Sequence, residues 1–182
     1  MIYYTADLHL GHENVIMFDN RPFPTIEQMD ETIIANWQAQ VREKDDVYIL
    51  GDIAYRSATR ISEYLDKLPG RKHLVIGNHD GRTLKDPNLR EYYFDSVEQI
   101  QTITDGGRRV VLCHYPLAEW PGMFRDAIHL YAHIHNKKAE TYKLMRQREN
   151  AYNAGCMINN YVPCTLDEVI RNNKAFWELD QT

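Results

Sequence analysis

The sequence predicts an α/β protein in which strands and helices alternate first and hairpin-like strands follow. Three observations support this class. Apolar runs with the length of strands recur along the chain, helical periodicity separates the early ones, and polar groups able to bind metal follow them directly. The chain has 182 residues, so we expect one domain over residues 1–182.

The first half has the order strand, helix, strand, helix, strand. Its predicted strands are residues 1–6, 47–50 and 73–76. Thr25 and Gln28 have the spacing of a capping box, and apolar residues then recur every three or four positions up to Val41. A second helical pattern covers residues 61–68. This order is typical of a parallel sheet covered by helices.

The second half has a different pattern. Residues 96–104 alternate weakly, and a Gly-Gly turn separates them from the apolar strand 109–113, which together indicate a hairpin. Further strands are expected at residues 128–132 and 152–157. Thr165 and Glu168 repeat the capping-box spacing, so a short helix should run from there to about residue 172. Parallel units followed by hairpins predict two packed mixed sheets with helices outside.

Composition excludes several classes of protein. The formal net charge is -5, which argues against broad electrostatic capture of nucleic acid or an anionic membrane. No apolar run approaches the length of a membrane span and no signal peptide is evident, so we expect a cytoplasmic protein. One basic cluster reads as a solvated face rather than a polyanion site: Lys137, Lys138, Lys143, Arg146 and Arg148.

The three cysteines do not form a disulfide framework. Cys113, Cys156 and Cys164 are odd in number and lack Cys-x-x-Cys spacing, which fits a reducing compartment. Cys113 precedes His114, so a nucleophile–base pair is an alternative to a metal role for that histidine. Neighbours along a strand point to opposite faces, however, and we therefore assign Cys113 to the core.

Five short motifs each directly follow a predicted strand. They are Asp7-Leu8-His9, Gly51-Asp52, Gly77-Asn78-His79-Asp80, His114-Tyr115-Pro116 and His133-Ile134-His135-Asn136. Motifs so far apart in sequence can converge only if the strand ends gather along one edge of a sheet, where open α/β sheets usually bind ligands. A single histidine or asparagine there is usually a turn former or a satisfied polar group, but five such strand ends favour a shared site.

The candidate ligands offer nitrogen and oxygen donors only, which suits two metal ions with a bridging carboxylate. In extended geometry Asp7 and His9 would face one side, as would His133 and His135. Gly51 permits a tight turn that would place Asp52 as the bridge. The candidate ligands are Asp7, His9, Asp52, Asn78, His114, His133 and His135.

Taken together, the five motifs resemble the calcineurin-like metallophosphoesterase superfamily in type and order. They extend from Asp7 to Asn136, and the sequences around Arg21 and Tyr161 also resemble a small bacterial and phage branch. The resemblance implies a four-layer α/β/β/α sandwich of two mixed sheets flanked by helices. One departure is Ala132, where the family usually has glycine before His-x-His. Its methyl group is tolerated on extended backbone but strained at positive φ.

The resemblance also implies roles for the motif residues. His79 would donate a proton to the leaving oxygen, and Asp80 would orient His79. A hydroxide bridging two divalent ions would attack phosphorus in line. We expect manganese, with iron, zinc or nickel as alternatives. One ion would be held by Asp7, His9, Asp52 and His135, and the second by Asp52, Asn78, His114 and His133.

The expected function is hydrolysis of a phosphomonoester or phosphodiester of a small molecule or nucleotide. Candidate substrate contacts are Asn78, His12 and Arg21; a surface or helix-start role is the alternative for His12, and a surface salt bridge for Arg21. A nuclease or nucleic-acid phosphatase is a second reading that the net charge disfavours. A non-catalytic binding scaffold of the same fold is the third.

Overall fold

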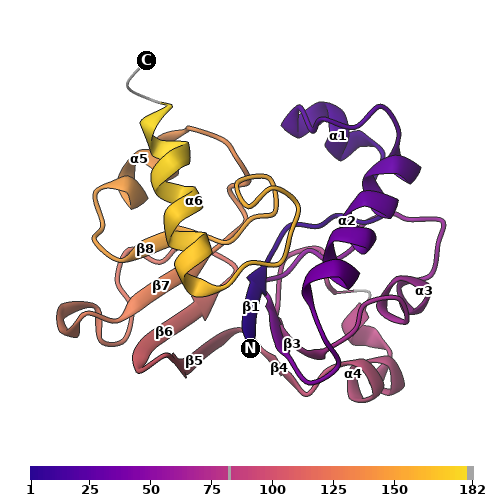
Figure 1. Cartoon of the computed structure of the whole chain (residues 1–182), viewed down its shortest axis with the longest axis horizontal. Helices are drawn as coiled ribbons and strands as arrows, with labels where there is room; N and C mark the ends of the chain where they lie inside the picture. The colour runs from indigo at the N-terminus through magenta and orange to yellow at the C-terminus, as the bar shows by residue number, and fades with distance from the viewer. Residues whose placement is uncertain (82, 180–182) are drawn as a thin grey trace.

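The computed structural model describes residues 1–81 and 83–179, which form a pair of four-stranded sheets lying between helices (Figure 1). In the first sheet all neighbouring strands are parallel, in the order β1 (Ile2–Thr5), β2 (Asp46–Ile49), β3 (Arg71–Val75) and β4 (Ser96–Glu98). The second sheet has the order β5 (Ile100–Asp105), β6 (Arg108–Cys113), β7 (Ile128–Tyr131) and β8 (Ala151–Asn153). In this sheet β5 and β6 are antiparallel, whereas β6 and β7, and β7 and β8, are parallel. The predicted fold class is confirmed, although the first sheet is parallel rather than mixed.

Residues 96–104 do not form the single strand that the sequence predicted. The chain changes sheets at Gln99, because β4 pairs with β3 in the first sheet and β5 pairs with β6 in the second. Residues of β5 alternate between exposed and half-buried, whereas Val97 is the buried residue of β4. The change of sheet explains why the alternation across this segment was weak.

The three predicted helices are present, and three short ones were not predicted. The helices are α1 (Asn14–Asp19), α2 (Ile26–Gln40), α3 (Ile61–Leu65), α4 (Pro87–Tyr93), α5 (Glu140–Arg146) and α6 (Leu166–Glu178), with short 3₁₀ turns η1 (Thr83–Lys85) and η2 (Met123–Arg125). Thr25 caps α2, and Thr165 with Glu168 forms the expected capping box of α6. The last helix nevertheless extends past residue 172, to Glu178.

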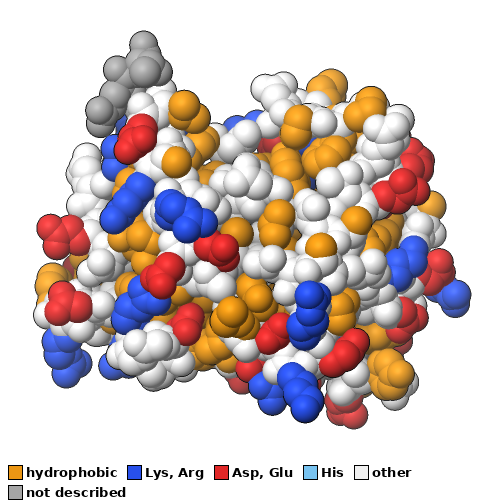
Figure 2. All heavy atoms as spheres, viewed as in Figure 1, with side chains coloured by type: hydrophobic (Ala, Val, Ile, Leu, Met, Phe, Trp, Pro, Cys, Tyr) orange, Lys and Arg blue, Asp and Glu red, His pale blue; other side chains and the backbone are white. Residues whose placement is uncertain are grey.

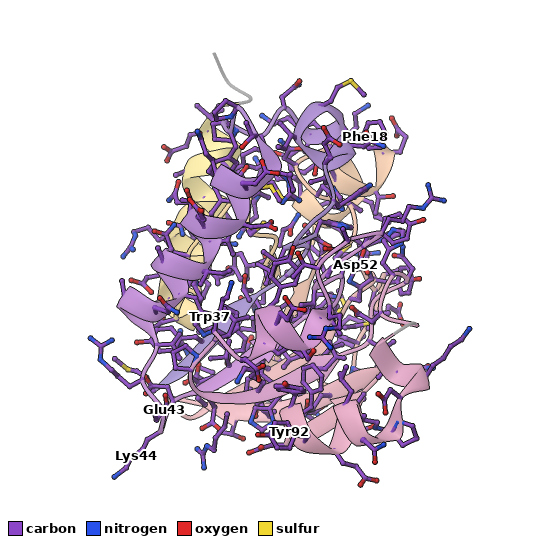
Figure 3. All side chains as sticks on the ribbon, turned by 90° about the vertical axis from the view of Figure 1, so that its right-hand side faces the viewer. Phe18, Trp37, Glu43, Lys44, Asp52 and Tyr92 are labelled. Carbon is purple, nitrogen blue, oxygen red and sulfur yellow. The ribbon has the colours of Figure 1, made fainter. Side chains whose placement is uncertain are left out.

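Alternating side chains of the first sheet build two of the cores. Tyr3, Val47 and Leu74 pack under α2, where Trp37 is fully buried (Figure 3). The next residue along each of these strands faces the second sheet and forms the core between the sheets: Tyr4, Tyr48 and Val75. A third cluster lies between the second sheet and α5. The order of layers is therefore helix, sheet, sheet, helix, as expected.

On the face drawn in Figure 2, basic and acidic side chains are interspersed rather than segregated. Within residues 1–81 and 83–179, no helix is both long and apolar enough to cross a bilayer. Charges of mixed sign on a surface do not attract one kind of charged partner over long range.

Candidate metal centre

All five motifs lie directly after strands that run in the same direction. Asp7 follows β1, Asp52 follows β2, Asn78 follows β3, His114 follows β6 and His133 follows β7. Because the carboxyl ends of parallel strands meet at one edge, the motifs of both sheets come together there. The structure therefore confirms the prediction that the five motifs converge at one edge of the sheets.

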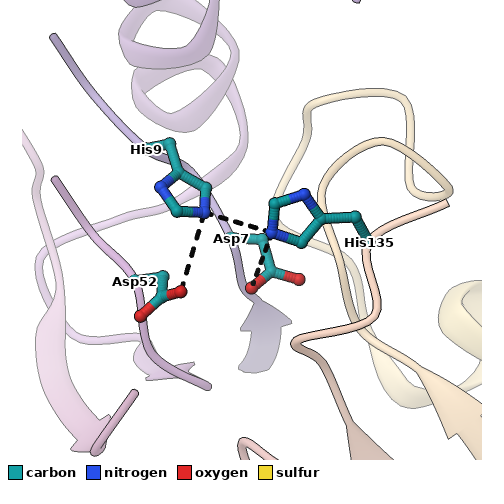
Figure 4. A group of neighbouring side chains, drawn as sticks. All are labelled: Asp7, His9, Asp52 and His135. Carbon is teal, nitrogen blue, oxygen red and sulfur yellow. Dashed lines mark hydrogen bonds and ion pairs between the residues drawn. The ribbon is translucent and has the colours of Figure 1, made fainter. Parts of the chain in front are cut away.

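Four side chains form the tightest group of donors (Figure 4). Asp7, His9, Asp52 and His135 each offer one donor atom, and these atoms lie within 4.8 Å of one another. The Nε2 atoms of His9 and His135 are 3.2 Å apart. Nε2 of His9 is 3.6 Å from Oδ2 of Asp52, and Nε2 of His135 is 3.9 Å from Oδ1 of Asp7. These are the four residues expected to hold the first ion.

The second expected group adjoins the first through Asp52. Oδ2 of Asp52 lies 3.7 Å from Nε2 of His114, which is 3.1 Å from Oδ1 of Asn78. The His133 ring lies 5.1 Å from the His114 ring between centroids, and it is exposed at the edge of the group. Asp52 is therefore the residue that lies close to both expected groups.

Hydrogen bonds behind the site fix two imidazoles with their lone pairs pointing into it. Nδ1–H of His114 donates to the carbonyl of Leu50 at 2.7 Å, and Nδ1–H of His135 donates to Oδ2 of Asp19 at 2.7 Å. Neutral rings held in this way present an unprotonated Nε2. Those lone pairs face the acceptor oxygen of Asn78 and the ring nitrogen of His9, an arrangement that a cation between them would stabilise. The donors therefore fit the divalent ions that the family resemblance implies.

Burial disfavours charge on the donors themselves. It raises the pKa of Asp7 to about 6, against the opposing effect of His135, and it lowers the pKa of His9 far below its usual range. His135 is the exception: burial would lower its pKa, but its hydrogen bond to Asp19 and the negative charges of Asp7 and Asp19 together raise it. A bound cation would favour the ionised carboxylate and the neutral imidazole, which are the forms that bind metal.

Five of the seven candidate donors are carried on left-handed backbone rather than on extended strands. The φ angles of Asp7, His9, Asp52, His133 and His135 lie between 52° and 69°. The expectation that extended geometry turns alternate residues to one side is therefore wrong for both Asp-x-His and His-x-His. Non-glycine residues with positive φ are uncommon and cluster at functional sites, where the surrounding structure holds them.

Two glycines allow the strand ends to approach each other. Gly51 has φ +82°, and a Cβ there would lie 2.6 Å from both Nδ1 of His114 and Cα of Gly77. A Cβ on Gly77 would lie 2.4 Å from Oδ1 of Asp52. Ala132, by contrast, does not have positive φ, so the methyl group that replaces the family's glycine causes no backbone strain.

Asp80 does not hold His79 as the resemblance implied. Its buried carboxylate accepts hydrogen bonds from the backbone N–H groups of Asp52, Ile53 and Gly77, at 3.0, 3.2 and 2.7 Å. It therefore joins the loop that carries Asp52 to the loop that carries His79, and among the hydrogen bonds of the described residues none links it to the His79 imidazole. We correct its role from orienting His79 to positioning Asp52.

Arg21 is a buried structural residue, so the expectations of a substrate contact and of a surface salt bridge are both wrong. Its guanidinium donates to the carbonyl oxygens of Asp7 and Leu8 at 2.8 and 2.9 Å and pairs with Asp19 at 3.2 Å. Its side chain is 0% exposed. The guanidinium is fully used in holding the loop after β1, which leaves none of it for a substrate.

Asp19 is the functional residue that the motifs did not reveal. One carboxylate oxygen accepts from both His135 and Arg21, and its partner oxygen lies 3.5 Å from Lys137. It ends a helix rather than a strand, so the rule that located the other site residues did not apply to it. No local sequence pattern marks it, because its burial and its pairing with Arg21 become visible only in the folded chain.

His79 and His12 lie at the opening of the site. The His79 side chain is 30% exposed, and its Nε2 is 4.0 Å from Oδ2 of Asp52. His12 contacts the rings of His9 and Tyr55, with centroids 5.6 and 4.9 Å away, and burial lowers its pKa. A cavity of about 360 Å³ adjoins His79. Larger hollows lie beside α4, but the donor geometry, not volume, locates the site.

Cys113 does not form a nucleophile–base pair with His114. The thiol lies on β6 and burial raises its pKa, which disfavours the thiolate. His114 uses Nδ1 on the Leu50 carbonyl and directs Nε2 toward Asn78. The assignment of Cys113 to the core is confirmed.

Two four-stranded sheets between helices, with a cluster of donors that could hold a metal ion, are the features expected of the calcineurin-like phosphoesterase fold. The chain belongs to the calcineurin-like phosphoesterase family, whose model matches residues 1–165. The match covers every donor residue described above, as well as His79 and Asp80. The family predicted from the five motifs is therefore confirmed.

Several relatives are similar over most of the chain. Protein MJ1445 of Methanocaldococcus jannaschii, described as uncharacterised, is 30% identical over 172 residues, which are 93% of this chain and 89% of that protein. Gene 66 protein of Mycobacterium phage D29 is 29% identical over 160 residues, or 75% and 79% of the two chains. Protein AQ665 of Aquifex aeolicus, of unknown function, has a solved structure with a TM-score of 0.73 and 28% identity, covering 94% of this chain and 98% of that one.

Proposed function

We propose that the protein is a dimetal-dependent hydrolase of a phosphomonoester or phosphodiester of a small molecule or nucleotide. The observation that carries this proposal is the approach of two imidazole nitrogens to one carboxylate oxygen: Nε2 of His9 and Nε2 of His114 lie 3.6 and 3.7 Å from Oδ2 of Asp52. Manganese is the expected metal, with iron, zinc or nickel as alternatives. One ion would be held by Asp7, His9, Asp52 and His135, and a second by Asp52, Asn78, His114 and His133.

Divalent ions bound there would activate water for in-line attack on phosphorus and neutralise the nonbridging oxygens. Side chains of the protein would bind the phosphate group and protonate the leaving group. Asn78 is exposed at the opening, where its amide can bind a phosphate oxygen. His79 lies beside the cavity and donates a proton to the departing oxygen. The same cavity is large enough for a small organic leaving group.

The test is metal content together with hydrolysis of 4-nitrophenyl phosphate and bis(4-nitrophenyl) phosphate in Mn²⁺. Asp52→Asn should lose both ions and activity even in excess metal, because the bridge loses its charge. Asp66→Asn is the control, since Asp66 is exposed and away from the donors. Metal binding without turnover of either ester would contradict hydrolysis and favour a scaffold. Turnover that persists in a metal-free preparation would contradict metal dependence.

A further inference from the structure

The loop after β2 carries a cation beside the candidate metal centre that the proposed function does not use. Arg56 is exposed and follows Tyr55, whose ring centroid is 4.0 Å from that of His79. Tyr55 and Arg56 line the cavity of about 360 Å³ together with Asn78 and His79. A leaving group that accepts a proton from His79 would occupy this cavity.

Contacts on both sides hold this stretch of the loop in place. Ala54 forms a β-bridge with Leu10. Three residues further, Oγ of Ser57 accepts the N–H of Thr59 at 3.0 Å and lies 3.1 Å from the hydroxyl of Tyr64. The two residues between these anchors therefore have a fixed position relative to the donors, which a binding residue needs.

Three features make Arg56 suitable for binding an anion. Its backbone has φ +49°, a strained conformation for a non-glycine residue. Its guanidinium lies over the Tyr55 ring, 5.1 Å from the centroid, which limits its freedom. Among residues 1–81 and 83–179, no carboxylate forms an ion pair with it. A guanidinium held over a cavity without a counterion can bind phosphate through two parallel hydrogen bonds.

We propose that Arg56 binds a second phosphate group, carried by the leaving group of the substrate. This specificity rests on the proposed function, because it needs a first phosphate at the metal centre. The substrate class is a phosphoester whose leaving group is itself phosphorylated. A nucleoside bisphosphate and the 5′ end of a nucleic acid strand share this chemistry. The Tyr55 ring contacts both the His79 ring and the Arg56 guanidinium, so it would lie beside the substrate between these two groups.

The test compares two nucleotides that differ by one phosphate. With Mn²⁺, kcat/KM is measured for adenosine 5′-monophosphate and adenosine 3′,5′-bisphosphate in wild type and in Arg56→Ala. The wild type should prefer the bisphosphate, and the variant should lose roughly tenfold of that preference, the scale of one charge-assisted contact. Arg60→Ala is the matched control, because Arg60 is exposed on the same loop but paired with Glu63 at 2.8 Å.

Calorimetric affinities of the metal-loaded protein for the same nucleotides repeat the comparison without turnover. Equal changes for both nucleotides in Arg56→Ala, or none, would overturn the role of Arg56, and activity toward 4-nitrophenyl phosphate would then leave the hydrolase proposal standing. A 5′-phosphorylated oligonucleotide identifies the source. If it is preferred over the bisphosphate and needs Arg56, the substrate is a strand end; the reverse order indicates a free nucleotide.

Discussion

Asp19 contacts the ring nitrogen of His135 that does not face the donors, and it thereby fixes which nitrogen is available to a metal. Asp19→Ala should lower metal affinity by about 10- to 100-fold, the usual effect of removing a hydrogen-bond partner of a ligand. Asp19→Asn keeps an acceptor for His135 and should retain more of the affinity. Isothermal titration calorimetry, in which metal is added to the metal-free protein, measures the metal affinity of both variants and of the wild type. Unchanged affinity in the alanine variant would contradict this positioning role.

A variant of His79 distinguishes metal binding from proton transfer, because this residue is proposed to transfer a proton and not to bind metal. His79→Ala should retain wild-type metal content while kcat falls by on the order of 100-fold, because no imidazole then protonates the leaving oxygen. The loss should be smaller for aryl esters, whose leaving groups need little protonation. Metal analysis and kcat for an alkyl and an aryl phosphate provide the comparison. Equal losses for the two esters would leave only charge stabilisation as the role of His79.

The expectation that functional groups directly follow strands identified the candidate donor residues. It did not identify the residues that hold these donors and their loop in place through hydrogen bonds. Asp7, Asp52 and His114 follow apolar runs that the sequence displays. Arg21 lies in a polar segment that reads as a surface loop, and only the folded chain shows that the carbonyl of Leu8 lies within its reach. Burial of a loop by distant segments leaves no local pattern. For the same reason Asp19 was missed.

At the scale of elements, the capping box of α6 offers a stability test. The backbone N–H of Thr165 donates to Oε2 of Glu168 at 2.9 Å, and the threonine side chain caps the first turn. Thr165→Ala should lower the free energy of unfolding by about 1 kcal/mol, measured by urea denaturation. Thr32→Ala in α2 is the control, because its hydroxyl donates to Gln28 within the helix and replacement should cost little. Equal losses in both variants would argue against the cap.

Length helps to decide which helices the sequence displays. Helix α2 has fifteen residues and α6 has thirteen, enough to repeat an apolar stripe, whereas α1 has six and α4 and α5 have seven. A helix of two turns shows too few repeats for its period to be recognised. The exception is α3, which has only five residues but was predicted because apolar residues recur from Ile61 to Leu68 before the turn at Pro69-Gly70. The division between β4 and β5 could not be predicted for a different reason. Which strands pair depends on the tertiary fold, and the sequence of one strand does not determine it.

At the scale of the whole molecule, His129 links stability to pH. It is fully buried in β7, donates from Nδ1 to the Val111 carbonyl and accepts the Leu117 N–H at Nε2. Burial lowers its pKa from 6.5 to about 4. Between these two pH values the His129 imidazole is protonated in the unfolded chain but not in the folded chain. The free energy of unfolding should therefore fall as the pH drops from about 6.5 to about 4. The shift corresponds to about 3 kcal/mol.

The measurement is urea unfolding of the metal-free protein between pH 4 and pH 7. Other groups titrate in this range, so the wild type is compared with His129→Gln, which lacks the proton but keeps a polar side chain. The wild type should lose more stability than the variant as the solution becomes acidic. Parallel pH profiles would show that the imidazole is protonated in the folded state or is hydrated there.

The crossing at Gln99 divides the donors between two segments of the chain. The segment before Gln99 supplies two carboxylates, the His9 imidazole and the Asn78 amide. The segment after it supplies the other three imidazoles, which belong to His114, His133 and His135. Neither segment has a full ligand set, so an ion that binds both adds its binding free energy to the association of the sheets. Metal affinity should thus report on how well the two sheets fit. A cavity made between them, far from any donor, would be detected as weaker metal binding before it caused unfolding.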